Sequence, residues 1–169
     1  MPIVGGALRL PDLRQLQALL NLACASVAWR RSRRTDCEQL LEGLRLDFAG
    51  VELSSGSLPV VRADPDQLRQ VLRTLIGNAV RHRGAEPPRI HVSARPVGRQ
   101  WLFEVRDNGV GVDPARHHAI FHAFSGAIQL PACRHLVRRH GGQLWVESAR
   151  GQGATFHFSL PATREVADA

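Results

Sequence analysis

The chain has 169 residues, 44% of them hydrophobic, which is enough for one well-filled core with residues left over at the ends. Its basic side chains are all arginine, 22 against 15 acidic residues, for a formal net charge of +7. The absence of lysine and tyrosine is typical of a GC-rich coding sequence, and the arginines are scattered without a recognised motif. We therefore expect no nucleic-acid partner.

The cysteines and the longest uncharged stretch indicate the cellular compartment of the protein. Cys24, Cys37 and Cys133 are far apart and lack a histidine or cysteine at metal-ligand spacing, so we expect buried thiols in a reducing cytoplasm. The uncharged stretch from Gln15 to Trp29 is too short to cross a bilayer, and the charges before it do not fit a signal peptide. The sequence thus predicts a cytoplasmic chain without a membrane segment.

The N-terminal part predicts two helices. Leucines and alanines recur at helical spacing from Leu10 to about Trp29, and a run of arginines follows up to Arg34. A second helical pattern consists of the apolar residues Cys37, Leu40, Leu41, Leu44 and Leu46 and ends near Gly50. The apolar stripe of the first helix has to be covered, either by a second chain or by its own domain.

Short strands and a well-marked helix come next. The segments 51–53 and 59–61 predict strands, with a turn at 54–57 between them. Asp64-Pro65-Asp66-Gln67 is a strong helix start, with Asp64 as the cap, Pro65 at the first helical position and Gln67 placed to close a capping box. This helix is predicted to run to about His82.

The remaining elements alternate between strands and helices. The pattern predicts strands over 90–94, 101–107, 143–147 and 154–160, and helices over 113–121 and 131–140. A Pro-Val-Gly turn is expected to join the first two strands as a hairpin. The tail from Ala162 is small and polar, and we expect it to fray.

The helix after Asp64 carries a polar flank beside its apolar stripe. Gln70, Thr74, Asn78 and Arg81 follow one another at spacings of four, four and three, so they share an edge between core and solvent. Such an edge can line a ligand pocket, although a solvated flank is the commoner explanation for such a pattern.

An inward-facing carboxylate strengthens the pocket interpretation. The period of two in a strand places Asp107 on the face that carries Phe103 and Val105. A buried carboxylate needs a hydrogen-bond donor, and the local sequence offers no obvious one, so a ligand amino group could supply it. Gly109 and Gly111 follow directly, where the backbone must turn sharply or approach a ligand closely.

The order of these pieces from Asp64 to Pro161 resembles the catalytic ATP-binding domain of sensor histidine kinases, in the GHKL superfamily shared with gyrase, Hsp90 and MutL. Four segments carry the resemblance: 64–82 is similar to the asparagine box, 107–111 to the first glycine box, 120–124 to the phenylalanine box, and 138–156 to the closing helix end and strands.

The resemblance implies an α+β fold, a two-layer sandwich whose mixed, largely antiparallel sheet has helices on one face and is preceded by N-terminal helices. It divides the chain into a helical region over 1–48, an ATPase domain over 49–161 and a flexible tail over 162–169. The implied nucleotide site consists of Asn78, Arg81, His82, Asp107, Gly109, Gly111, Ile128, Leu130 and Thr155.

The resemblance also implies roles within that site and cofactors for it. The cofactors are ATP or ADP with Mg²⁺. Asp107 would accept a hydrogen bond from the adenine amino group, and Thr155 would lie near the adenine. Asn78 would coordinate Mg²⁺, and Arg81 would meet phosphate.

The phosphate-binding part departs from the family pattern. Family members carry a lid and a second glycine box, Gly-Thr-Gly-Leu-Gly-Leu, and here its three glycine positions hold Ser125, Ala127 and Gln129, while Gly126 stands at the threonine. Those glycines let backbone amides approach the triphosphate. Thr74 stands where the family often has a second asparagine. We expect adenine recognition to survive and phosphate handling to be impaired.

No histidine precedes His82, so the N-terminal helices lack the family's acceptor histidine. The favoured hypothesis is a nucleotide-binding domain for phosphotransfer, either as part of a longer kinase or as a stand-alone protein. It would act with a partner signalling protein, which carries the acceptor histidine or is a response regulator. The alternatives are an inactive pseudokinase that serves as an interaction module, and a stand-alone serine kinase of the anti-sigma-factor kind. Because the kinases place a dimerisation region before this domain, we also expect a homodimer through the N-terminal helix.

Overall fold

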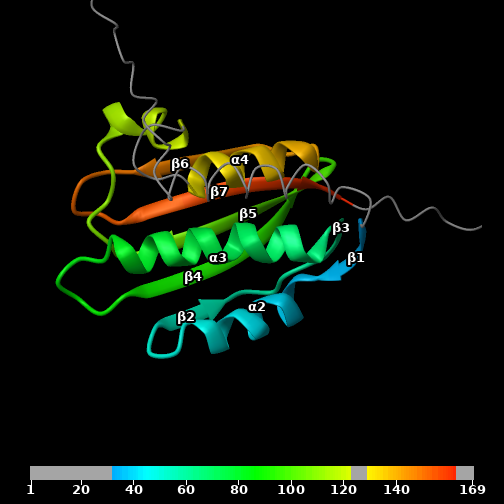
Figure 1. Ribbon diagram of the computed structural model, residues 1–169, viewed down its shortest axis with the longest axis horizontal. Helices are drawn as coiled ribbons and strands as arrows, with labels where there is room; N and C mark the ends of the chain where they lie inside the picture. Colours follow the sequence, from blue (N-terminus) through cyan, green and yellow to red (C-terminus); the bar gives the residue numbers. More distant parts are fainter. Residues whose placement is uncertain (1–31, 123–128, 163–169) are drawn as a thin grey trace, which may run out of the picture.

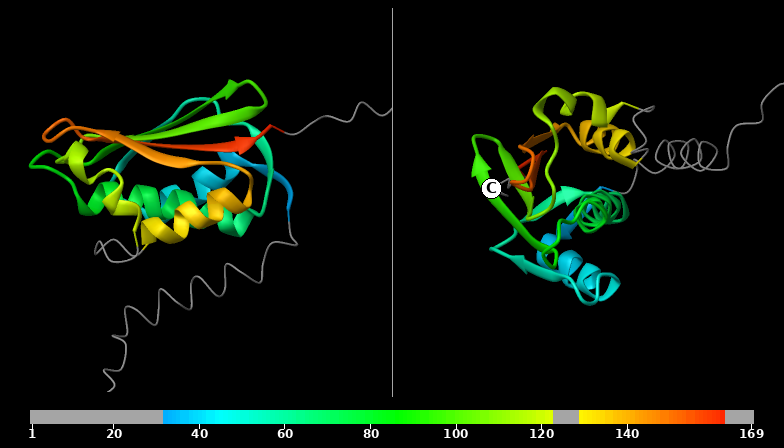
Figure 2. Two further views of the ribbon diagram at one scale, coloured as in Figure 1. Left: turned by 90° about the horizontal axis from the view of Figure 1, so that it is seen from above. Right: turned by 90° about the vertical axis from the view of Figure 1, so that its left-hand side faces the viewer.

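Strands and helices form two layers, with the described helices α2, α3 and α4 on one face of the main sheet (Figures 1 and 2). The computed structural model describes residues 32–122 and 129–162. The elements in chain order are β1 (Arg33–Asp36), α2 (Cys37–Asp47), β2 (Glu52–Ser55), β3 (Val60–Ala63), α3 (Pro65–Arg81), β4 (Arg89–Val97), β5 (Gln100–Asp107), η2 (Pro114–Arg116), η3 (Ala119–Phe121), α4 (Gln129–Arg139), β6 (Leu144–Ser148) and β7 (Ala154–Pro161).

The main sheet has five strands in the order β2-β4-β5-β7-β6. Strand β2 runs parallel to β4, and every other pair in this sheet is antiparallel. Strands β1 and β3 form a separate antiparallel pair. The structure therefore confirms the predicted α+β sandwich with a mixed, largely antiparallel sheet. The predicted helix from Leu10 to Trp29 lies outside the described residues.

Helix α3 begins as the sequence predicts. The Asp64 carboxylate accepts hydrogen bonds from the backbone N–H groups of Asp66 and Gln67, and Pro65 occupies the first turn. The second half of the capping box is absent, because the Gln67 side chain turns to another partner. Its Oε1 atom lies 3.1 Å from Nε2 of His140, at the end of α4. Gln67 thus ties two helices together instead of capping its own.

The core lies between the sheet and the helices. Phe103 on β5 and Phe158 on β7 are fully buried and stack with their ring centroids 4.7 Å apart. Four apolar side chains of α2 belong to the same core, whereas Leu46 at its end is 83% exposed. Helix α2, which precedes residue 48, therefore packs into the same core as α3 and the sheet.

Several local predictions differ from the structure. Ser54 and Ser55 belong to β2 and do not form a turn, and β2 and β3 belong to different sheets. The segment 113–121 forms two short 3₁₀ turns where a helix was expected. The hairpin turn falls at Gly98 and Arg99, because β4 continues to Val97. Strand β1 was not predicted, since its four residues continue the arginine run.

The two described cysteines are buried free thiols, as predicted. Burial raises the pKa of Cys37 and of Cys133 to about 12. Cys24 lies outside the described residues. Within the described ranges, no helix is long and apolar enough to cross a membrane.

Candidate functional site

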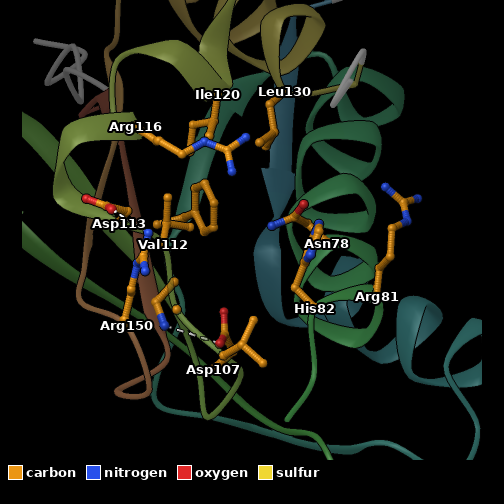
Figure 3. A pocket seen from close by; sticks show the side chains of 14 residues that line it. Asn78, Arg81, His82, Asp107, Val112, Asp113, Arg116, Ile120, Leu130 and Arg150 are labelled. Carbon is orange, nitrogen blue, oxygen red and sulfur yellow. Dashed lines mark hydrogen bonds and ion pairs between the residues drawn. The ribbon is translucent and has the colours of Figure 1, made fainter. Parts of the chain in front are cut away.

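A cavity of about 540 Å³ opens between the C-terminal half of α3, the end of β5 and the segment that follows β5. Figure 3 shows side chains of these elements around it, and Ala154 and Phe156 of β7 also line it. Aliphatic and aromatic side chains supply much of the lining: Val110, Val112, Ile120, Leu130, Ala154 and Phe156. A cavity that combines an apolar part with several polar and charged side chains can hold a heterocyclic ligand that carries charged groups.

Asp107 supplies the carboxylate at the floor of this cavity. Its Oδ1 atom accepts hydrogen bonds from the backbone N–H of Gly109 (2.8 Å) and of Ala154 (3.2 Å). Among residues 32–122 and 129–162, no donor is recorded for its second oxygen, and Figure 3 shows the carboxylate directed into the cavity. The expected absence of a local donor was wrong, because the chain turns back at Gly109 and offers its amide.

Burial raises the pKa of the Asp107 carboxyl group above its ordinary value of 3.8. The two amide hydrogen bonds and the nearby His82 act in the opposite direction, but burial dominates. The site therefore holds an acceptor that is partly withdrawn from water. Such an acceptor gains most when a ligand N–H replaces the lost solvent.

The glycines after Asp107 let two backbone segments approach closely. A Cβ atom on Gly109 would lie 2.5 Å from the carbonyl oxygen of His82. Gly111 has φ +72°, a conformation that disfavours any other residue, and its Cβ would overlap the carbonyl oxygen of Ala149. Only Gly111 lines the cavity itself, and Gly109 acts through its hydrogen bond to Asp107.

Helix α3 forms the opposite wall. Asn78 and Arg81, the last two residues of the polar flank, line the cavity together with His82, which the family resemblance places in the site. Gln70 and Thr74, nearer the start of the helix, are not among the lining residues. Thr74 lies instead near Cys133 on α4, whose thiol donates to the Val71 carbonyl oxygen. The polar flank therefore contributes to the cavity only over its last turn.

Strand β7 presents Ala154, rather than the predicted Thr155, to the cavity. Ala154 and Phe156 line the cavity, and successive side chains of a strand point to opposite faces. Thr155 consequently lies on the face of the sheet away from the helices. Of the two residues expected from the altered glycine box, Leu130 lines the cavity, and Ile128 lies outside the described residues.

Three charged residues of the cavity were not found by sequence analysis. Asp113 and Arg116, in the segment after Gly111, and Arg150, in the turn between β6 and β7, all line it. Arg150 Nη2 lies 2.7 Å from Oδ2 of Asp113, which ties the two loops together (Figure 3). These residues lie in loops and 3₁₀ turns, where no periodic pattern marks a side chain as inward-facing.

A Mg²⁺ ion would find one neutral oxygen ligand here, the side-chain amide of Asn78. The described residues contain no group of three or more histidine, cysteine, aspartate or glutamate side chains that could hold a metal ion. Mg²⁺ commonly takes one or two protein ligands and completes its shell with water and substrate phosphates. The donor set therefore fits a metal ion that arrives with a phosphorylated ligand, and Asn78 would hold it on the protein side.

The model of the family described as histidine kinase-, DNA gyrase B- and HSP90-like ATPase matches residues 63–164. Cyanobacterial phytochrome A of Nostoc sp. is 38% identical over 127 residues, which cover 69% of this chain and 17% of that protein. The adaptive-response sensory kinase SasA of a Synechococcus strain is 37% identical over 136 residues, 73% of this chain and 35% of that protein.

Two solved structures share the fold. Full-length ShkA in complex with AMPPNP aligns with a TM-score of 0.73 and 29% identity, covering 88% of this chain and 35% of that chain. Histidine kinase ThkA in complex with the response regulator TrrA aligns with a TM-score of 0.69 and 21% identity, covering 90% of this chain and 50% of that chain.

The chain thus belongs to the histidine kinase-, DNA gyrase B- and HSP90-like ATPase family. This membership confirms the family that the sequence motifs indicated. The chain spans only 17% and 35% of the lengths of the two curated relatives.

Proposed function

We propose that the cavity binds an adenine nucleotide, with the adenine amino group donating a hydrogen bond to Asp107. The observation that carries this proposal is the geometry of that carboxylate. Two backbone amides fix one of its oxygens, and the group points into a cavity of about 540 Å³, a volume typical of small-molecule sites. The complex of ShkA with AMPPNP, an ATP analogue, supports the same class of ligand.

The phosphates would extend from the slot toward α3. Asn78 would hold Mg²⁺ there together with phosphate oxygens, and the ion would neutralise charge on the phosphate chain. The Asn78 amide is neutral, so it can orient the ion but contributes little affinity without the nucleotide. We therefore expect Mg²⁺ to bind together with the nucleotide rather than before it.

The signalling role proposed is phosphotransfer with a partner protein. SasA is named a sensory kinase, and ThkA has been solved with a response regulator. Residues 1–81 contain no histidine, so the acceptor histidine would be supplied from outside them, by a partner protein or by another part of a longer kinase. The proposal predicts no radiolabel on this chain after incubation with labelled ATP alone.

The second candidate function is nucleotide binding with little or no ATP turnover. The residues at the three glycine positions of the second glycine box favour it. Ser125, Ala127 and Gln129 replace residues whose backbone amides would otherwise approach the triphosphate. We accordingly expect ADP and a non-hydrolysable ATP analogue to bind with similar affinity. A chain that binds nucleotide without turnover would serve as an interaction module regulated by ligand.

Titration calorimetry with ADP, AMPPNP and UDP, each with and without Mg²⁺, tests the proposal. UDP carries the same diphosphate but lacks the adenine amino group, so it serves as the matched control. We expect heat of binding with ADP and AMPPNP and little with UDP. Equal affinity for ADP and UDP would refute adenine recognition, and no binding of any nucleotide to the folded chain would leave only the interaction-module function.

A further inference from the structure

The charges that line the cavity do not balance. The lining contains three arginines, Arg81, Arg116 and Arg150, and two carboxylates, Asp107 and Asp113. Asp107 lies at the floor and is held by backbone amides. Arg150 is neutralised by its ion pair with Asp113. The remaining positive charge of the lining therefore belongs to Arg81 and Arg116.

Asp113 uses both of its oxygens without pairing to Arg116. Its Oδ1 atom accepts from the Ala115 amide at 2.9 Å, and its Oδ2 atom binds Arg150. The Ala115 hydrogen bond is the main cause that lowers the pKa of Asp113, and Arg150 and then Arg116 add to it through space. Within the described ranges, no carboxylate lies within ion-pair distance of the Arg116 guanidinium.

The short turn that carries Arg116 is fixed at both ends. The Arg116 N–H donates to the Asp113 carbonyl oxygen at 2.8 Å, and the Asp113–Arg150 ion pair anchors the turn to the β6–β7 loop. Figure 3 shows the Arg116 side chain extending from this wall into the cavity, toward the side of Asn78 on α3. Arg81 lies beyond Asn78, at the outer edge of the helix (Figure 3).

We propose that Arg116 binds the phosphates of the nucleotide, from the wall opposite Asn78. A guanidinium offers up to five N–H donors in a planar fork that matches phosphate oxygens, and it stays charged at every relevant pH. It supplies from a side chain part of the donor capacity that Ser125, Ala127 and Gln129 no longer provide through a glycine-rich backbone. The cavity is thereby specific for adenine nucleotides that carry a diphosphate or longer chain, over adenosine.

This inference rests on the proposed nucleotide binding, and its test separates the two. Calorimetry compares adenosine with ADP on the wild-type chain and on Arg116→Gln, Arg116→Lys and Arg62→Gln. Arg62 is an exposed arginine on β3, at the opposite end of α3, so its replacement removes the same charge away from the cavity. Far-UV circular dichroism and thermal unfolding of each variant confirm that it is folded.

We expect Arg116→Gln to weaken ADP binding by about tenfold or more, the usual effect of losing a charge-assisted hydrogen bond, and to leave adenosine binding within about twofold. Arg116→Lys should keep part of the preference for ADP, and Arg62→Gln should behave as wild type. The inference falls if ADP affinity is the same in Arg116→Gln and wild type, or drops equally in Arg62→Gln. If the wild type binds neither ligand, the proposed function falls with it.

Discussion

The backbone N–H of Ala154, at the start of β7, donates to Oδ1 of Asp107, at the end of β5, with 3.2 Å between nitrogen and oxygen. The same oxygen accepts from Gly109 at 2.8 Å. One carboxylate oxygen therefore joins two neighbouring strands and the loop between β5 and η2. Backbone hydrogen bonds hold the Asp107 side chain in place without a ligand. A substitution that keeps these bonds therefore tests the role of Asp107 in binding separately from its role in folding.

Asp107→Asn should leave the fold intact and no less stable. An asparagine keeps the oxygen that accepts from Gly109 and Ala154, and it removes a charge that burial disfavours. Because the folded-state pKa of Asp107 is raised, this group's contribution to stability is largest at low pH and is lost as pH rises through the folded pKa. At pH 7 the variant should therefore unfold at a temperature equal to or above that of the wild type.

The pH dependence provides the check on this prediction. The difference in unfolding temperature between Asp107→Asn and wild type should narrow as the pH approaches 3.8, the ordinary pKa of the group, because Asp107 then becomes neutral as well. Scanning calorimetry over this range measures it. A variant that unfolds well below the wild type at pH 7 would mean that the ionised carboxylate stabilises the fold.

Alanine substitutions at two glycines distinguish the cost of backbone strain from the cost of steric overlap, because the two glycines share the same backbone conformation. Gly111 and Gly151 have φ +72° and +76°, but a Cβ on Gly111 would overlap the Ala149 carbonyl oxygen, whereas a Cβ on Gly151 meets nothing within 4 Å. Gly151→Ala should lose about 1–2 kcal/mol of unfolding free energy from backbone strain alone. Gly111→Ala should lose clearly more in urea unfolding. Equal losses would show that the Gly111 loop shifts freely.

His140 should make the fold less stable in mild acid. Burial is the main cause that lowers its pKa below 6.5, Arg139 adds to this, and Asp64 opposes it. A histidine with a lowered folded-state pKa contributes stability that is present above pH 6.5 and is lost as the pH falls through the folded pKa. The free energy of unfolding should consequently decline below about pH 6.5.

Urea unfolding at several pH values tests this contribution. His140→Gln should flatten part of the decline, and His135→Gln, an exposed position on the same helix, should keep the wild-type profile. Identical pH profiles for His140→Gln and wild type would show that other groups cause the decline.

The sequence predicted the helices and strands that are determined by residues close together in the chain. The cap at Asp64 and the period of 3.6 located α3 almost to the residue, and the period of two placed Asp107 on the inner face of β5. The polar flank and the family motifs located Asn78 and Arg81 on α3 and His82 directly after it, which all line the cavity. In each case the signal lies within one helix or one strand, where the spacing of side chains fixes the face on which they lie.

Features that depend on distant contacts were missed. The family resemblance implies Thr155, but Ala154 faces the cavity, because the register of β7 against β5 decides which side chain lies on that face. Arg116 lies in a 3₁₀ turn of three residues, too short to show a period. Gln67 was expected to complete a local cap, but α4 brings His140 within reach of it. No local sequence pattern predicts any of these three features.

Calorimetric titration of ADP into the wild-type chain and into Asp107→Asn, with Mg²⁺ present, tests the central claim most directly. The Asp107 carboxylate accepts a hydrogen bond from the adenine amino group. In Asp107→Asn the side-chain NH2 would face the amino group, and two donors cannot form a hydrogen bond with each other. We predict one ADP site in the wild type and no measurable binding to Asp107→Asn, with both proteins unfolding cooperatively. Equal ADP affinity in the two folded proteins would contradict adenine recognition by Asp107.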